Sequence, residues 1–160
     1  MTLYRVQLPL TYLKQGESCY TDEPSLVMTS LRSSVAIMMF NKRLHFSGIC
    51  HVRPVICRNS KSCTGHCDEA FTHMDCATKQ MFEIFDVLGV CRNEVDVKIF
   101  GCVDVTACSD TKIFKAMLRE EGLHVADSHV TDSLNKKILF FTHTGEVFAK
   151  KVKKDKILHF

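Results

Sequence analysis

Two residues that together could perform nucleophilic catalysis stand in neighbouring apolar segments, Ser34 in LRSSVAIMMF and His51 in FSGICHVRP. An imidazole that accepts the proton of a serine hydroxyl makes that hydroxyl a nucleophile. The same pair in a protein core can also be a buried histidine with a hydrogen-bond partner. A third group that orients the imidazole separates the two cases, so a serine and a histidine alone leave both interpretations open.

The strands expected around these residues decide whether their side chains meet. Composition and alternation predict strands over residues 26–40 and 44–53. A two-residue loop at Lys42-Arg43 would place Ser34 directly opposite His51. A loop one residue earlier slides the partner by two residues and keeps the face, whereas a three-residue loop breaks the match. We therefore expect both side chains on one face, at a hydrogen-bond distance of about 2.6–3.2 Å.

A second group of residues has the chemistry of metal ligands. The segment CRNSKSCTGHC, residues 57–67, offers soft thiolates and an imidazole, as zinc prefers. The candidate ligands are Cys57, Cys63, His66 and Cys67, and His73 and Cys76 follow at the start of a predicted helix. The spacing is irregular, and the adjacent His66 and Cys67 would strain simultaneous ligation. A zinc-bound loop and free loop thiols therefore both remain open.

The hydrophobic periodicity of the remaining chain indicates which elements position these groups. Apolar residues recur at helical spacing before Gly89, and a second helix begins near Ser109 and ends at Gly122. Strands are predicted over residues 94–101, 124–130, 136–143 and 146–152, the last two forming a hairpin. These elements predict one α+β domain over residues 1–160, with an antiparallel or mixed sheet and two helices packed on one side.

Composition excludes several classes of protein. The 160 residues are 46% hydrophobic, and the formal net charge of +3 comes with lysines gathered near the end, where residues 153–160 are predicted as a basic tail. Nucleic-acid binding is not expected from this charge, and no apolar segment approaches the roughly 20 residues of a membrane helix. The N-terminus lacks the features of an export signal, and nine cysteines are typical of reduced thiols or a metal site. We expect a cytoplasmic protein.

Four short motifs in the chain are LRSSVA, GICHVRP, VDVKIFG and THTGEVFAKKV. Together they resemble the CheD family, the chemoreceptor glutamine deamidases of bacterial chemotaxis. The corresponding family segments are LGSCVA, G-x-A-H-x-x-L-P, A-K-I-F-G-G and the closing T-G-x-V-x-x-K hairpin. The motifs stand in order over residues 26–152. The resemblance implies hydrolysis of glutamine side-chain amides on methyl-accepting receptors, no required metal, and chemoreceptors and the CheC phosphatase as partners.

The resemblance transfers to the candidate site with two substitutions. In the family, the cysteine of LGSCVA attacks the carboxamide, a histidine acts as base and then acid, and a threonine six residues before the cysteine orients the histidine. His51 matches that histidine, but Ser34 stands for the cysteine and Met28 for the threonine. Thr29 is a candidate orienter, although strand alternation predicts that its side chain points away.

These substitutions weigh against the family's chemistry and leave three functions open. The first is a CheD-type deamidase in which Ser34 and His51 are the catalytic residues. The second is a non-catalytic CheD-like module that binds a chemoreceptor or a CheC-type phosphatase. The third is an interaction module stabilised by zinc. The sequence separates them only in part.

Overall fold

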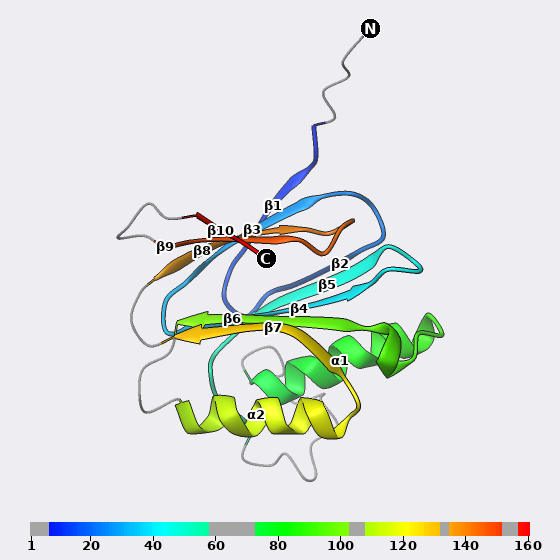
Figure 1. Ribbon diagram of the computed structural model, residues 1–160. Helices are drawn as coiled ribbons and strands as arrows, with labels where there is room; N and C mark the ends of the chain where they lie inside the picture. The colour runs from blue at the N-terminus through cyan, green and yellow to red at the C-terminus, as the bar shows by residue number, and fades with distance from the viewer. Residues whose placement is uncertain (1–6, 58–72, 103–107, 132–134, 152–156) are drawn as a thin grey trace, which may run out of the picture.

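Two five-stranded sheets lie face to face in the computed structural model, which describes residues 7–57, 73–102, 108–131, 135–151 and 157–160 (Figure 1). The first sheet contains, in spatial order, β1 (Leu10–Leu13), β3 (Leu26–Leu31), β8 (Lys136–Phe141), β9 (Val147–Lys151) and β10 (Ile157–His159). The second contains β2 (Ser18–Thr21), β5 (Phe46–Val52), β4 (Ser34–Asn41), β6 (Asp96–Cys102) and β7 (His124–Thr131). The pairs β1–β3 and β6–β7 are parallel, and the other pairs are antiparallel.

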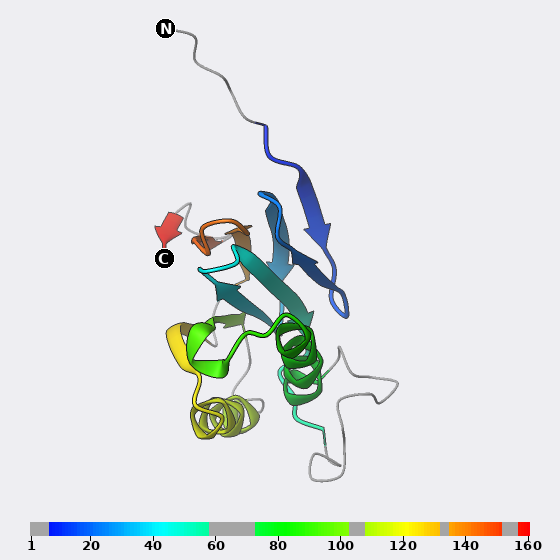
Figure 2. The same cartoon turned by 90° about the vertical axis from the view of Figure 1, so that its right-hand side faces the viewer.

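Two helices cover the outer face of the second sheet. Helix α1 (Met74–Val87) and helix α2 (Cys108–Glu120) lie on the same side of it, as both views show (Figures 1 and 2). A short 3-10 turn, η1 (Arg92–Glu94), precedes β6. The predicted α+β architecture with both helices on one side is confirmed. No helix among the described residues is long and apolar enough to cross a membrane.

The central strand β4 takes part in two cores because its side chains alternate between the faces of the sheet. Val35, Ile37 and Met39 pack toward the helices. Ala36 and Met38 instead pack between the sheets, with residues of β3, β8 and β9. By the same alternation, Ser34 at the start of β4 belongs to the layer between the sheets, where it is 1% exposed.

A turn divides the segment predicted as one strand over residues 26–40. Ser33 has a φ of 44°, in the left-handed region, and it separates β3 in the first sheet from β4 in the second. The chain thus crosses from one sheet to the other immediately before Ser34. Because β3 and β4 belong to different sheets, the alternation of side chains in β4 does not predict which way a residue of β3 points. This applies to Thr29.

In the β4–β5 hairpin, Ser34 and His51 lie on the same face of the sheet, as predicted, but they are not directly opposite each other. Ala36, rather than Ser34, lies opposite His51. The connecting loop is residues 42–45, longer than the predicted two-residue loop, and it ends on His45 with a φ of 50°. Because this register differs from the predicted one by an even number of residues, Ser34 and His51 remain on the same face.

The ends of the chain contain strands that the sequence did not predict. β1 and β2 precede the first predicted strand, and β10 pairs with β9. The segment predicted as a basic tail therefore ends in a strand, while residues 152–156 lie outside the described residues. The first helix begins at Met74 and is followed by Gly89, whose φ of 72° suits the predicted helix end.

Candidate active site

Ser34 and His51 are in hydrogen-bond contact, as their shared face predicted. The Nε2 atom of His51 lies 2.7 Å from the Oγ atom of Ser34, and both side chains are buried. The backbone N–H of Arg32 donates to Ser34 Oγ at 3.2 Å. Since Oγ accepts this bond, its own hydrogen is available for His51 Nε2.

Thr29 supplies the third group on the other side of the imidazole. Its Oγ1 lies 2.8 Å from His51 Nδ1 and donates to the backbone carbonyl of Leu13, also at 2.8 Å. A hydroxyl has one hydrogen, so Thr29 must accept the bond from Nδ1–H. The hydrogen-bond chain therefore assigns the imidazole hydrogen to Nδ1 and leaves Nε2 as the acceptor of the Ser34 proton.

The prediction that Thr29 points away from His51 is wrong. Thr29 lies on β3, which faces β5 across the layer between the two sheets, and its side chain is fully buried there. Met28, at the position that the family resemblance gives to threonine, is partly exposed on the alternate face of the strand. The crossing at Ser33 separates the alternation of β3 from that of β4.

The backbone around His51 is fixed by the turn that follows β1. Gly16 N–H donates to the His51 carbonyl at 2.7 Å, and His51 N–H donates to the carbonyl of Glu17 at 3.1 Å. Leu13, which accepts from Thr29, is the last residue of β1. The main chain and the side chain of His51 are thus both held by the same segment near the N-terminus, which the sequence did not single out.

Burial lowers the pKa of His51 below its ordinary value of 6.5, while the nearby Leu13 carbonyl, which favours the charged ring, opposes the shift. Desolvation penalises the charged imidazolium, so the folded protein favours the neutral ring. A neutral ring with Nδ1 protonated and Nε2 free is the form that a general base requires.

We expect His51 to titrate below pH 6.5 in the folded protein, because its pKa is lowered. As the pH falls, His51 of the unfolded chain should bind a proton first, while the folded protein still keeps the imidazole neutral. The free energy of unfolding therefore decreases as the pH falls through the unfolded pKa. An NMR titration of the imidazole signals measures the pKa of His51. The signals of this ring are assigned by their absence in the His51→Gln variant. A midpoint at or above 6.5 would contradict it.

An open cavity of about 450 Å³ leads to the Ser34–His51 pair. Lys14, Gln15 and Tyr12 line it from the β1 side, and Ser30 and Arg32 line it from the end of β3. Lys14 and Arg32 are exposed cations at this opening. The lining of this cavity thus includes the Ser34–His51 pair and two cations at the surface.

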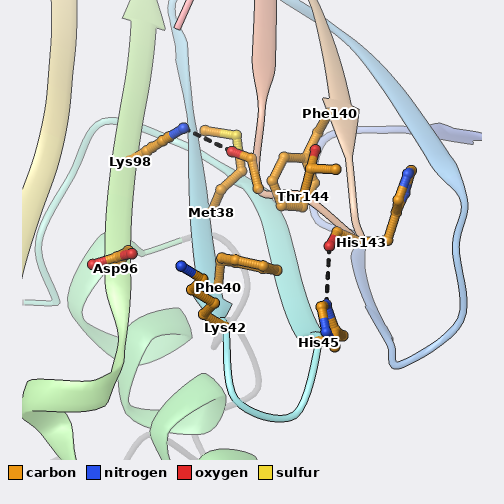
Figure 3. Close-up of a pocket in the computed structure, with 10 residues that line it drawn as sticks. Met38, Phe40, Lys42, His45, Asp96, Lys98, Phe140, His143 and Thr144 are labelled. Atoms are coloured by element: carbon orange, nitrogen blue, oxygen red, sulfur yellow. Dashed lines mark hydrogen bonds between the residues drawn. The ribbon is translucent and has the colours of Figure 1, made fainter.

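A second cavity, of about 420 Å³, lies at the other end of β4 (Figure 3). Lys98 Nζ donates there to the carbonyl of Gly145 at 2.7 Å, and His45 Nδ1 lies 3.3 Å from the carbonyl of His143. These polar groups bind main-chain carbonyls where the β4–β5 and β8–β9 hairpins meet. Ser34 and His51 do not line this cavity, and strand geometry places Met38, its lining residue on β4 closest in sequence to Ser34, about 13 Å along the strand from Ser34. It is not part of the same site.

The predicted metal ligands are only partly within the described chain. Cys63, His66 and Cys67 lie outside the described residues. Cys57 is described, and its ligand atom lies within 4.8 Å of those of His73 and Cys76. The structure therefore brings together one predicted ligand and two residues from the start of α1.

Comparisons with known proteins relate the chain to one family. A family model described as CheD chemotactic sensory transduction matches residues 58–151. The probable chemoreceptor glutamine deamidase CheD 2 of Geobacter sulfurreducens is 31% identical over 161 residues, which cover 95% of this chain and 96% of the relative. The probable chemoreceptor glutamine deamidase CheD of Oleidesulfovibrio alaskensis is 30% identical, with 89% of this chain and 73% of the relative covered.

A solved structure gives a weaker likeness. YlmD from Geobacillus stearothermophilus aligns with a TM-score of 0.45 and 10% sequence identity, over 76% of this chain and 58% of its own. That similarity is too low to support an argument about function. The two relatives, in contrast, match 95% and 89% of this chain, whereas the family model matches residues 58–151.

Proposed function

The chain belongs to the CheD family, and on this premise we propose that it hydrolyses the side-chain amide of glutamine residues in chemoreceptors, with Ser34 as the nucleophile. The observation that carries the proposal is the hydrogen-bond chain from Ser34 through His51 and Thr29 to the Leu13 carbonyl. It supplies the nucleophile, base and orienting group that acyl transfer needs.

The proposed reaction has two halves, each with His51 as the proton carrier. The Ser34 hydroxyl attacks the amide carbon while its proton moves to His51 Nε2. Collapse of the tetrahedral adduct breaks the carbon–nitrogen bond, and the His51 proton leaves with ammonia. Water then attacks the ester and gives its proton to His51, which returns it to Ser34 Oγ as the glutamate is released. Thr29 holds the ring throughout.

Serine in place of the family's cysteine makes the orienting group more important. A hydroxyl has a pKa far above the ~8.5 of a thiol, so it forms little anion without a base that is already in position. Thr29, buried with the imidazole between the sheets, supplies that positioning. The substitution of Met28 for the family's threonine therefore does not leave His51 without an orienter.

The partner follows from the proposed substrate. The cytoplasmic domain of a chemoreceptor would present glutamine side chains to the opening lined by Lys14 and Arg32. A CheC-type phosphatase as a second partner rests on the family resemblance alone.

We expect the full chain to deamidate glutamines of a purified chemoreceptor cytoplasmic fragment, with one ammonia released per glutamate formed. Peptide mass spectrometry locates the converted residues, and an ammonia assay measures the rate. The Ser109→Ala variant, which changes an exposed serine of α2, should match the unaltered protein. Tight binding of receptor fragments without conversion of any glutamine would overturn the enzymatic proposal and favour the non-catalytic binding module.

A further inference from the structure

We propose that Cys57, His73 and Cys76 bind a divalent metal ion with an affinity for thiolates, and that Zn²⁺ is the best match. The three ligand atoms lie within 4.8 Å of one another. Cys57 follows β5 in sequence, whereas His73 immediately precedes α1 and Cys76 lies in the first turn of that helix. Two cysteines and one histidine form a donor set that zinc uses in proteins.

The spacing of the three atoms suits a tetrahedral ion. Zinc binds sulfur at about 2.3 Å and nitrogen at about 2.0–2.1 Å, which places neighbouring ligands roughly 3.4–3.8 Å apart. From an upper separation of 4.8 Å, each pair of ligand atoms therefore has to approach by at most about 1.0–1.4 Å. The two cysteines are buried and the histidine is partly exposed, so the ligands form a site at the edge of the core that an ion can reach.

The start of α1 carries two of the three proposed ligands. His73 is the N-cap residue but makes no side-chain capping bond, although that position usually has Ser, Thr, Asp or Asn. Cys76 lies in the first turn, where the positive end of the helix dipole stabilises a thiolate. Two thiolates and a neutral imidazole also balance the charge of a divalent cation.

Asp75 provides an independent indication of a cation. It is 2% exposed, and its Oδ1 accepts the backbone N–H of Cys57 at 3.0 Å. Its other oxygen, Oδ2, is buried without a hydrogen-bond partner in the described structure. A buried carboxylate oxygen with no partner is costly. Asp75 is not one of the three grouped ligands, so a cation bound to them would offset that cost by its charge rather than by ligation.

The position of this site connects it to the segment after His51. Met74 N–H donates to the Val55 carbonyl at 2.9 Å, and Ile56 N–H donates to Asp110 at the start of α2, at 3.2 Å. A metal ion at Cys57 would fasten the same segment to α1 through its ligands. The ion would thus act as a structural link rather than as part of the reaction at Ser34.

The metal site can be tested on the full chain with cobalt and zinc as probes. We expect the reduced protein to bind one equivalent of Co²⁺ with the strong visible absorption of tetrahedral coordination and the near-ultraviolet band of thiolate ligation. Zinc should displace the cobalt, and protein purified without chelators should contain near one equivalent of zinc. Loss of outer partners of a metal site already costs about 10- to 100-fold in affinity. His73→Gln, Cys57→Ser and Cys76→Ser should therefore each weaken binding more than that.

Control variants separate metal binding from folding and from the alternative ligands. Cys91→Ser changes an exposed free cysteine and should leave the cobalt spectrum unchanged. His73→Gln alters a partly exposed position and tests ligation even if the buried cysteine variants fail to fold. The proposal is overturned if the reduced, folded protein gives no thiolate-to-cobalt band. It is equally overturned if each of the three variants binds cobalt as tightly as the unaltered protein. A Cys57–Cys76 disulfide that binds no ion after it is reduced would also overturn it.

Discussion

Replacing Ser34 with alanine is expected to lower kcat/KM for glutamine deamidation at least roughly a thousandfold, equivalent to about 4 kcal/mol of transition-state stabilisation. The change removes the proposed nucleophile and leaves His51 Nε2 without the hydroxyl that it contacts at 2.7 Å. Water attack directed by His51 would be the only route left within the proposed mechanism. Receptor-fragment deamidation followed by mass spectrometry measures the loss, and Ser109→Ala is its surface control.

Ser34→Cys distinguishes loss of the nucleophile from loss of the site's shape. A thiol reaches its anion more readily than a hydroxyl, and cysteine stands at this position in the family motif. We expect this variant to work at least as fast as the unaltered protein. If Ser34→Ala kept the full rate, Ser34 would not be the nucleophile. If Ser34→Cys were inactive in a folded protein, the site would not be arranged for nucleophilic attack at this position.

Thr29→Val should lower kcat/KM by roughly 10- to 100-fold, up to the lower limit of the roughly 100- to 10,000-fold that general acid–base catalysis contributes, because His51 itself is kept. Valine has nearly the same shape as threonine but cannot accept the His51 Nδ1–H bond, so the imidazole loses its orienter and its fixed tautomer. The variant should also change the ¹⁵N shifts of the ring, which report the tautomer directly. Thr29→Ser retains the hydroxyl and is expected to restore most of the rate.

A second buried threonine controls for lost stability in this experiment. Thr78 is 4% exposed, and its Oγ1 donates to the Met74 carbonyl at 2.7 Å within α1. Thr78→Val removes a comparable hydrogen bond without touching His51, so it should reduce stability while leaving the rate and the imidazole spectrum unchanged. If Thr29→Val resembled Thr78→Val in both measurements, Thr29 would have a structural role only.

The contact between Ser34 and His51 could be predicted because it requires only that both side chains lie on the same face of the sheet. An error of two residues in the strand register does not change that face. The predicted loop was too short, yet the observed register of β4 and β5 differs by an even number of residues. Such a shift retains the face of every side chain. The exact partner, Ala36, depends on the loop at residues 42–45 and the left-handed His45 within it, which the sequence pattern did not indicate.

Thr29 was named as a candidate orienter, but its contact with His51 could not be predicted, because that contact is made between two sheets. Side chains alternate between the two faces within a single strand. The turn at Ser33 places Thr29 and Ser34 in strands of different sheets, so alternation does not relate their directions. A serine with a φ of 44° had no distinguishing signal in LRSSVA. The Leu13 carbonyl is a backbone group in an unpredicted strand, so no side-chain motif marked it either.

The proposed reaction depends on the fraction of molecules in which strand β1 is paired with the first sheet. Among the described strands, β1 is an edge strand that pairs only with β3, and its Leu10 and Tyr12 side chains are 60% and 53% exposed. Edge elements with few buried contacts open more readily than the core. When β1 detaches, the Leu13 carbonyl leaves Thr29, and the Thr29 hydroxyl becomes free to donate to Nδ1 and reverse the tautomer. The measured turnover would then be the rate of the closed molecule multiplied by the fraction of molecules in which β1 is in place.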